Sequence, residues 1–288
     1  MKFKDKAFKI AFDNLVFLEK DFIVKKSSST NQIKYNGNNE VFSDSRFNFN
    51  VLHRSNDLKA ELKKSIDFFK NDKETGYFLF GKISNNEKIY NIDLSSAYLT
   101  ILFNTGKISN QLFEKINGLK KADRLKILGM LAYQPFIFSY EKGKLISTEQ
   151  QKNEFRPIFF YCVKETFELI YKIKNKIGSD FVFSWVDGIY FTGEHNINLI
   201  SDILKSKKLK FTSERLFNFT SVKADELNLY AYDKFNKKKG VFEEKKICIP
   251  DSNTYRVNNI IFDFNEAIQK NNEKDLNEII DVYLKNKY

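Results

Sequence analysis

The chain has 288 residues, enough for one large domain or two small ones with a sizeable core. Its hydrophobic content of 42%, with 16% aromatic residues, excludes an intrinsically disordered protein. The formal net charge of +11 favours a polyanionic partner, usually nucleic acid, and the lack of any run of 18 apolar residues argues against a membrane partner.

The cysteines and histidines predict no metal centre of their own. Cys162 and Cys248 lack a metal-ligand spacing, and the chain start lacks a signal-peptide core, so we expect reduced thiols in a cytoplasmic protein. His53 and His195 have no partner spacing, so histidine-based metal or acid–base chemistry is not expected.

The first third of the chain alternates between polar and periodic segments. After a first helix, residues 25–32 are typical of a polar linker, and residues 35–45 of a loop. Residues 56–70 predict a helix with Leu58, Leu62 and Ile66 on one face. Residues 76–83 predict a strand that forms a hairpin with the next strand, which ends at Asp93.

The middle of the chain is mainly helical in pattern. Residues 109–119 and 120–134 predict two helices that meet near Gly118. Residues 155–178 predict a long amphipathic helix whose buried face carries four apolar side chains, Phe160, Val163, Phe167 and Ile170.

The last part of the chain returns to strands. Residues 179–193 predict two strands joined by a tight turn at Asp187–Gly188. A helix follows residue 195, then strands and a basic turn, at residues 209–217, 227–232 and 234–240, and a mainly helical tail. Hairpins with flanking helices indicate an α+β fold with an antiparallel sheet.

Two carboxylates stand at strand ends, Asp93 and Asp187. If their strands are neighbours in one sheet, the two anions converge and require a bridging cation. Aspartate oxygens without histidine suit Mg²⁺, and two Mg²⁺ ions held by two aspartates serve in-line phosphoryl transfer. Each residue alone also has a structural explanation, since Asp-Gly is a common hairpin turn and Asp93 can cap a helix.

Three segments carry a resemblance to a known family. The segment "DLSSAYLTIL" resembles the first palm motif of family B DNA polymerases, with Leu99 in place of the usual Pro and matches at Asp93, Ser96, Tyr98, Thr100 and Ile101. The segment "KILGMLAYQ" resembles the fingers motif through Lys126 and Tyr133, with three departures, Met130, Leu131 and Gln134.

The third segment, "WVDGIYF", resembles the second metal-binding motif of the same family. Asp187 matches the metal-binding Asp, whereas Trp185 replaces the first Asp and Gly188 the Ser. The resemblance covers roughly residues 76 to 240, and it implies a polymerase palm.

The resemblance implies roles at the reacting centre. Asp93 and Asp187 would be the catalytic metal ligands, with the Leu94 carbonyl completing one coordination shell. Ser96 and Tyr98 would contact the nucleotide, and the Tyr98 ring would exclude a 2′-hydroxyl.

It also implies contacts farther from the metals. Lys126 would meet the triphosphate, with Arg124 as a nearby competitor, and Tyr133 would pack beside the nascent base pair. Tyr230 matches the primer-strand motif, in which Asn228 replaces a lysine. Phosphate contacts would then come from Lys234, Lys237, Lys238 and Lys239.

The implied organisation is that of a reduced polymerase. An N-terminal helical or extended region, 1–75, contains no paired-acid exonuclease signature, so no proofreading is expected. The palm would comprise 76–107 and 136–240, with short fingers at 108–135 and a thumb-like tail at 241–288. Helices at 265–270 and 275–286 are expected in this tail.

We therefore expect a Mg²⁺-dependent DNA polymerase, active also with Mn²⁺ and typical of a virus or mobile element. Its partners would be primer–template DNA, dNTPs and other replication proteins or a protein primer. A reverse transcriptase-like polymerase remains an alternative, because Asp93, Tyr98 and Asp187 also fit its motifs, although its Leu-Pro-Gln-Gly motif is absent. A degenerate palm that only binds nucleic acid is the other, favoured by four substitutions, at Trp185, Met130, Gln134 and Asn228.

Overall fold

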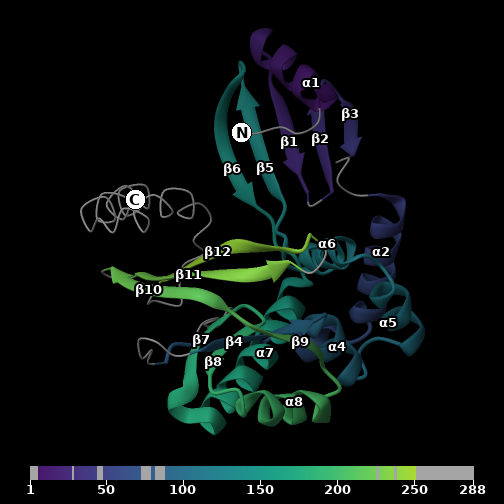
Figure 1. Ribbon diagram of the computed structural model, residues 1–288. Helices are drawn as coiled ribbons and strands as arrows, with labels where there is room; N and C mark the ends of the chain where they lie inside the picture. The colour runs from purple at the N-terminus through teal and green to yellow at the C-terminus, as the bar shows by residue number, and fades with distance from the viewer. Residues whose placement is uncertain are drawn as a thin grey trace. The chain divides into compact units, whose positions relative to one another are not determined.

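The computed structural model describes residues 6–250 except 28, 44–47, 73–78, 82–87, 225–226 and 237–238. Helices combine with three antiparallel sheets, which confirms the expected α+β class (Figure 1). The chain divides into two compact units, of which the first comprises Met1–Glu74 and Tyr98–Val163 and the second Thr75–Ala97 and Lys164–Tyr288. In the part of the chain described, no helix combines the length and apolar character needed to cross a bilayer.

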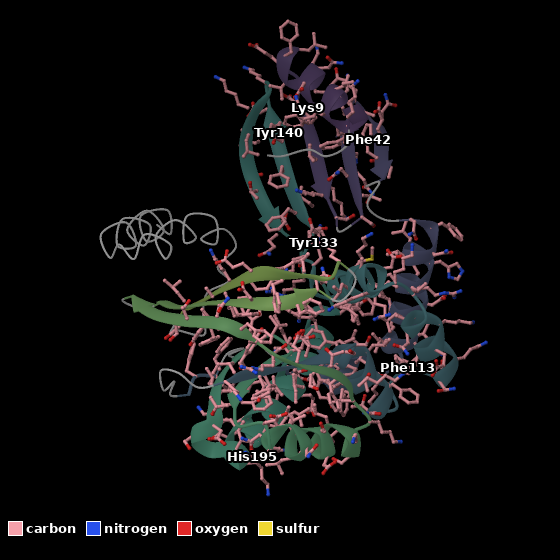
Figure 2. The ribbon with its side chains drawn as sticks, in the orientation of Figure 1. Lys9, Phe42, Phe113, Tyr133, Tyr140 and His195 are labelled. Carbon is pink, nitrogen blue, oxygen red and sulfur yellow. The ribbon has the colours of Figure 1, made fainter. Side chains whose placement is uncertain are left out.

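The first unit contains a five-stranded sheet of order β3-β2-β1-β5-β6. Its strands are β1 (Phe22–Lys26), β2 (Thr30–Tyr35), β3 (Asn38–Ser43), β5 (Phe136–Glu141) and β6 (Lys144–Gln150). Helix α1 (Lys6–Phe17) buries Phe8 against one face, where its ring meets Phe42 edge-on at 5.4 Å. On the same face, Phe12 of α1 meets Phe22 edge-on at 5.6 Å and Tyr140 at 5.3 Å, so aromatic rings join helix to sheet (Tyr140 is labelled in Figure 2).

The linker and loop predicted over residues 25–45 are wrong, because these residues form much of β1, β2 and β3. The turn between β2 and β3 is Asn36–Gly37, both with positive φ, 47° and 79°, as a two-residue hairpin requires. Residues 136–150 form β5 and β6 of the same sheet, in which β5 pairs with β1 through Val24 and Phe138. Strands β2 and β3 were predicted as linker and loop because many of their side chains are polar.

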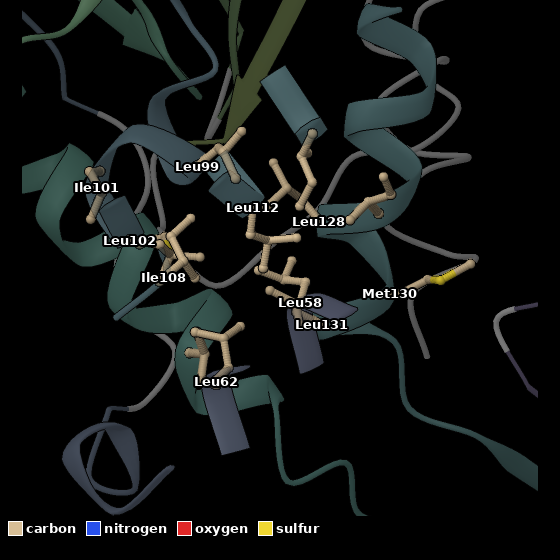
Figure 3. Packing of buried hydrophobic residues seen from close by; sticks show 14 of the residues in the cluster. Leu58, Leu62, Leu99, Ile101, Leu102, Ile108, Leu112, Leu128, Met130 and Leu131 are labelled. Carbon is tan, nitrogen blue, oxygen red and sulfur yellow. The ribbon is translucent and has the colours of Figure 1, made fainter. Parts of the chain in front are cut away.

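Helices form the rest of the first unit: α2 (Phe49–Lys63), α3 (Ile66–Phe69), α4 (Ala97–Asn104), α5 (Asn110–Asn117) and α6 (Lys121–Ala132). The predicted helix over 56–70 breaks between α2 and α3. The two helices expected to meet near Gly118 are confirmed as α5 and α6. Their apolar faces close one core with α2 and α4, whose most buried members include Leu58, Leu62, Leu99, Leu102 and Leu131 (Figure 3).

The long helix is confirmed as α7 (Arg156–Ile177), but its buried face was predicted with the wrong rotation. Val163 and Ile170 are buried as expected, whereas Phe160 and Phe167 are only half-buried. The fully covered positions recur at helical spacing, at Ile158, Cys162, Thr166, Leu169 and Ile173. Large aromatic side chains therefore mark the edge of this face, not its centre.

The second unit contains a four-stranded sheet of order β7-β8-β4-β9. Its strands are β4 (Ile89–Ser95), β7 (Phe181–Trp185), β8 (Gly188–Thr192) and β9 (Lys210–Arg215), with α8 (Asn196–Ser206) between β8 and β9. The predicted hairpin of β7 and β8 is confirmed, although its loop is Val186–Asp187, because Trp185 pairs with Gly188.

The other predicted hairpin, of residues 76–83 with the Asp93 strand, is wrong. Its turn lies outside the described residues, but Phe80 pairs with Phe183 of β7 instead of with β4. Two backbone hydrogen bonds support this placement: Gly81 N donates to Val182 O at 2.8 Å, and Ser184 N donates to Leu79 O at 2.9 Å.

A three-stranded sheet, β10 (Phe217–Ala224), β11 (Leu227–Asn236) and β12 (Val241–Pro250), completes the second unit. It packs against the four-stranded sheet, where the ring of Tyr230 stacks on Phe183 at 3.9 Å. The tail expected to be helical from residue 241 thus begins with a strand. Its predicted helices, 265–270 and 275–286, lie outside the described residues.

Candidate active site

Asp93 and Asp187 come from adjacent strands of the four-stranded sheet. Asp93 pairs with Gly188 in the antiparallel register of β4 and β8, and Asp187 directly precedes that glycine. The Leu94 amide donates a hydrogen bond of 3.1 Å to the Asp187 carbonyl, which holds the loop against β4. The expectation that the two strands are neighbours is therefore confirmed.

Gly188 leaves the space that the Asp93 carboxylate uses. A Cβ at Gly188 would lie 3.2 Å from Asp93 Oδ1 and 3.1 Å from Tyr190 Cε2, closer than side-chain atoms normally pack. A serine, as in the resembled motif, would therefore push on this carboxylate. The departure from that motif has a steric reason in this chain.

The charges of both carboxylates influence the hydroxyl group of Tyr190. Burial is the main cause that raises the pKa of Tyr190, followed by the charge of Tyr232 and by the 3.0 Å hydrogen bond with its hydroxyl. The negative charges of Asp93 and Asp187 raise the pKa further.

A lysine already neutralises part of this charge. Lys234, from β11, places Nζ 3.4 Å from Asp93 Oδ2 and forms a closer ion pair with Glu214 Oε1 of β9. Burial by itself lowers the pKa of Lys234, but the hydrogen bond to Glu214 and the charge of Asp93 outweigh it, so the pKa is raised. Lys234 thus contacts these carboxylates, although we expected it to contact primer phosphates.

Glu214 is a site residue that the sequence interpretation missed. Thr212 pairs with Asp93, and Glu214 lies two residues farther along β9, on the same face of the sheet. The alternation of residues 210–215 predicts that Glu214 lies on one face of a strand. Only the register of β4 with β9 shows that this is the face that carries Asp93. Asp93 therefore has the Glu214 carboxylate nearby in addition to Asp187, because Lys234 forms ion pairs with both Asp93 and Glu214.

The oxygen ligands fit a hard divalent cation. Mg²⁺ is commonly bound through one or two carboxylates, with waters and substrate phosphates completing its octahedron. Asp93 and Asp187 offer such a pair, and the Lys234 ammonium shows that a cation is accommodated beside Asp93. Over the described residues, no cluster of three or more His, Cys, Asp or Glu side chains has a metal-binding arrangement.

Backbone strain occurs on both sides of the carboxylate pair. Ser96, directly after β4, has φ of 56°, and Val186, directly before Asp187, has φ of 55°. A positive φ is unfavourable for a residue with a Cβ, especially a β-branched one, and costs on the order of 1–3 kcal/mol. Such strain concentrates at functional sites, where the surrounding structure maintains it.

The remaining implied nucleotide contacts belong to the first unit. Tyr98 packs edge-on against Phe159 at 5.4 Å, at the border of that unit's core. Lys126 forms an ion pair with Asp123 at 3.3 Å. Arg124 donates hydrogen bonds to the carbonyls of Asn117 and Leu119, which fixes the connection between α5 and α6. These bonds favour a structural role for Arg124 over a contact with the triphosphate.

The residues expected to contact the primer differ in their exposure. Tyr230 is only 4% exposed and stacks on Phe183, so this side chain packs in the core, and its primer contact stays a prediction. Lys239 is exposed and pairs with Glu243 at 2.8 Å. Lys237 and Lys238 lie outside the described residues.

No protein-family model matches the chain, and no curated protein matches it. The polymerase resemblance therefore depends on the three motifs and on the geometry of their residues.

Proposed function

We propose that the protein is a template-directed DNA polymerase that adds dNTPs to a 3′-hydroxyl group with the help of Mg²⁺. The supporting observation is the pair Asp93 and Asp187, since Asp93 of β4 pairs with Gly188 of the neighbouring strand β8 and Asp187 directly precedes that glycine. The net charge of +11 adds a reason for a nucleic-acid partner.

In this proposal, the chain's own residues bind and orient the reacting groups. Asp93 and Asp187 are the metal ligands, together with the Leu94 carbonyl. The bound divalent metal would offset the charge that develops on the phosphates and lower the pKa of the attacking hydroxyl. The 3′-oxygen forms the new bond to the α-phosphorus, pyrophosphate leaves, and the hydroxyl proton passes to water.

Lys234 has a defined task in the same proposal. Its ammonium stabilises Asp93 and Glu214 while the site holds no metal. A divalent cation at Asp93 would compete with the lysine, whose flexible side chain would then be available to a phosphate group.

The test is extension of a labelled primer on DNA and RNA templates with four dNTPs and Mg²⁺. Asp187→Asn keeps the size of the side chain and removes its charge, so we expect a loss on the order of 10³-fold in rate, equivalent to several kcal/mol. Asp202→Asn is the matched control, because Asp202 is an exposed residue of α8 in the same unit.

Addition without regard to template sequence would refute the template-directed part. Equal rates for the two variants would refute the metal role of Asp187. Faster extension on RNA than on DNA would identify the reverse transcriptase-like alternative.

A second candidate function is nucleic-acid binding without catalysis. The ion pairs of Lys234 with Asp93 and Glu214 favour it, because they neutralise the carboxylates without any metal. This candidate predicts DNA binding with no extension and no Mn²⁺ binding that depends on Asp93.

A further inference from the structure

The first unit contains a cavity of about 880 Å³ whose lining includes neither Asp93 nor Asp187. Its lining comes from the β1–β2 turn, from α2, from the end of α6 and from the start of α7. This volume is within the range of small-ligand sites, roughly 300–1,000 Å³. The cavity is therefore large enough for one nucleotide.

The cavity is lined by three cations, Lys59, Lys152 and Arg156, and by one carboxylate, Glu154. Glu154 already has a partner, because Lys63 Nζ lies 3.7 Å from its Oε1. Within the described ranges, no carboxylate lies at ion-pair distance from Lys59, and burial lowers the pKa of this lysine. An anion in the cavity would supply the missing partner.

Aromatic rings form the other part of the lining. Tyr133, Phe155 and Phe160 all line the cavity. The Lys59 ammonium lies 5.7 Å from the Phe155 ring centre, and the Arg156 guanidinium lies 4.9 Å from that of Phe160. Rings beside cations are the combination that holds an unpaired base next to its phosphate.

Partly buried hydrogen bonds of Asn153 fix this lining in place. The Asn153 amide donates to the carbonyls of Leu131 at 3.0 Å and Tyr133 at 2.6 Å. Its Oδ1 accepts from the Phe155 amide at 3.0 Å. One side chain thus joins the end of α6 to the start of α7, so that Tyr133 and Phe155 need little ordering when a ligand binds.

We propose that this cavity binds one unpaired nucleotide of a nucleic-acid strand, with its phosphate on Lys59, Lys152 and Arg156 and its base on the aromatic rings. The binding requires no divalent metal. It goes beyond the proposed polymerase activity, and it holds equally for a protein that binds nucleic acid without catalysis.

The test is fluorescence anisotropy of a labelled oligothymidylate in EDTA, over a series of salt concentrations. Lys59→Met keeps the length of the side chain and removes its charge, and Lys64→Met makes the same change at an exposed residue that ends the same helix. We expect Lys59→Met to weaken binding about fivefold, the effect of losing about 1 kcal/mol. Its plot of log K against log salt should also be shallower by about 0.7 than that of Lys64→Met, as the loss of one phosphate contact to a single strand predicts.

Equal affinity and equal salt dependence for the two variants would overturn the proposal. Urea unfolding of each variant separates a folding defect from a binding defect. If Lys59→Met unfolds, Lys152→Met takes its place, since Lys152 is an exposed residue of the same lining.

Two further arms identify the source of the nucleotide and its position. Binding of labelled dTMP, without binding of the oligonucleotide, would overturn the proposal of a strand and leave a mononucleotide site. Photocrosslinking of an oligonucleotide that carries 5-iodouracil should label Tyr133, Phe155 or Phe160, and labelling only outside these residues would refute the placement. These arms contain EDTA and measure binding without extension, so failure of the polymerase proposal and failure of this one are distinguishable.

Discussion

Replacement of Gly188 by alanine should damage the site through a methyl group that has no room. The new Cβ would lie 3.2 Å from Asp93 Oδ1, 3.2 Å from the Trp185 carbonyl oxygen and 3.1 Å from Tyr190 Cε2. Contacts between carbon atoms are most favourable at about 3.5–4.0 Å, so the neighbours must retreat by a few tenths of an ångström. The hairpin register holds Trp185, and the aromatic stack holds Tyr190, so the half-exposed Asp93 carboxylate moves most.

The magnitude follows from this strain. Overpacking commonly costs about 1–3 kcal/mol, and we expect about 1–2 kcal/mol here because one neighbour is a flexible side chain at the surface. Mn²⁺ affinity should fall about tenfold, as is usual when the support of a metal ligand is disturbed. Urea unfolding measures the first quantity, and electron paramagnetic resonance of free Mn²⁺ measures the second.

Gly129→Ala is the matched control for this variant. Gly129 lies within α6, where a Cβ would meet nothing within 4 Å. The same methyl group should there stabilise the protein by about 1 kcal/mol through helix propensity, with no effect on Mn²⁺ binding. Unchanged stability and unchanged Mn²⁺ affinity in Gly188→Ala would refute the proposed steric link between Gly188 and Asp93.

Three other variants test the core and the site charges. Leu58→Ala removes a fully buried side chain and should cost about 2–5 kcal/mol in urea unfolding; a loss below about 1 kcal/mol would contradict the packing in Figure 3. Lys234→Met should strengthen Mn²⁺ binding, measured by calorimetry, because it removes a competing ammonium from Asp93; weaker binding would show that the lysine supports the metal site. Its effect on stability should stay within about 1 kcal/mol, since these ion pairs are partly exposed. Folding raises the pKa of Tyr190 above its usual 10.0, so the stability from its neutral phenol is complete below about pH 10 and is lost as the pH rises further. Tyr190→Phe should therefore make the alkaline loss of stability shallower, and an unchanged pH profile of urea unfolding would contradict this.

Local patterns predicted many of the elements. The spacing of Leu58 and Leu62 marked the buried face of α2, and the apolar run around Asp187–Gly188 marked the hairpin of β7 and β8. The long helix α7 was also predicted, but the choice of Phe160 and Phe167 for its buried face was wrong. Bulky aromatic side chains satisfy the helical period at the border of a face as well as at its centre, so the period alone leaves the rotation open.

Strand pairing was the level at which prediction from the sequence failed. The polar strands β2 and β3 were predicted as loop, and the partner of Phe80 was misassigned. A strand carries its own alternation, but its partner depends on which distant segment completes its hydrogen bonds and covers its apolar face.

The candidate site shows the same division. The sequence by itself identified Asp93 and Asp187, because a carboxylate at the end of an apolar strand needs a compensating partner wherever the strand is placed. Only the tertiary structure selected Lys234 as that partner, placed Glu214 beside the same lysine and buried Tyr230. Local chemistry states that a charge must be neutralised, whereas contacts between residues more than a hundred positions apart decide which side chain neutralises it.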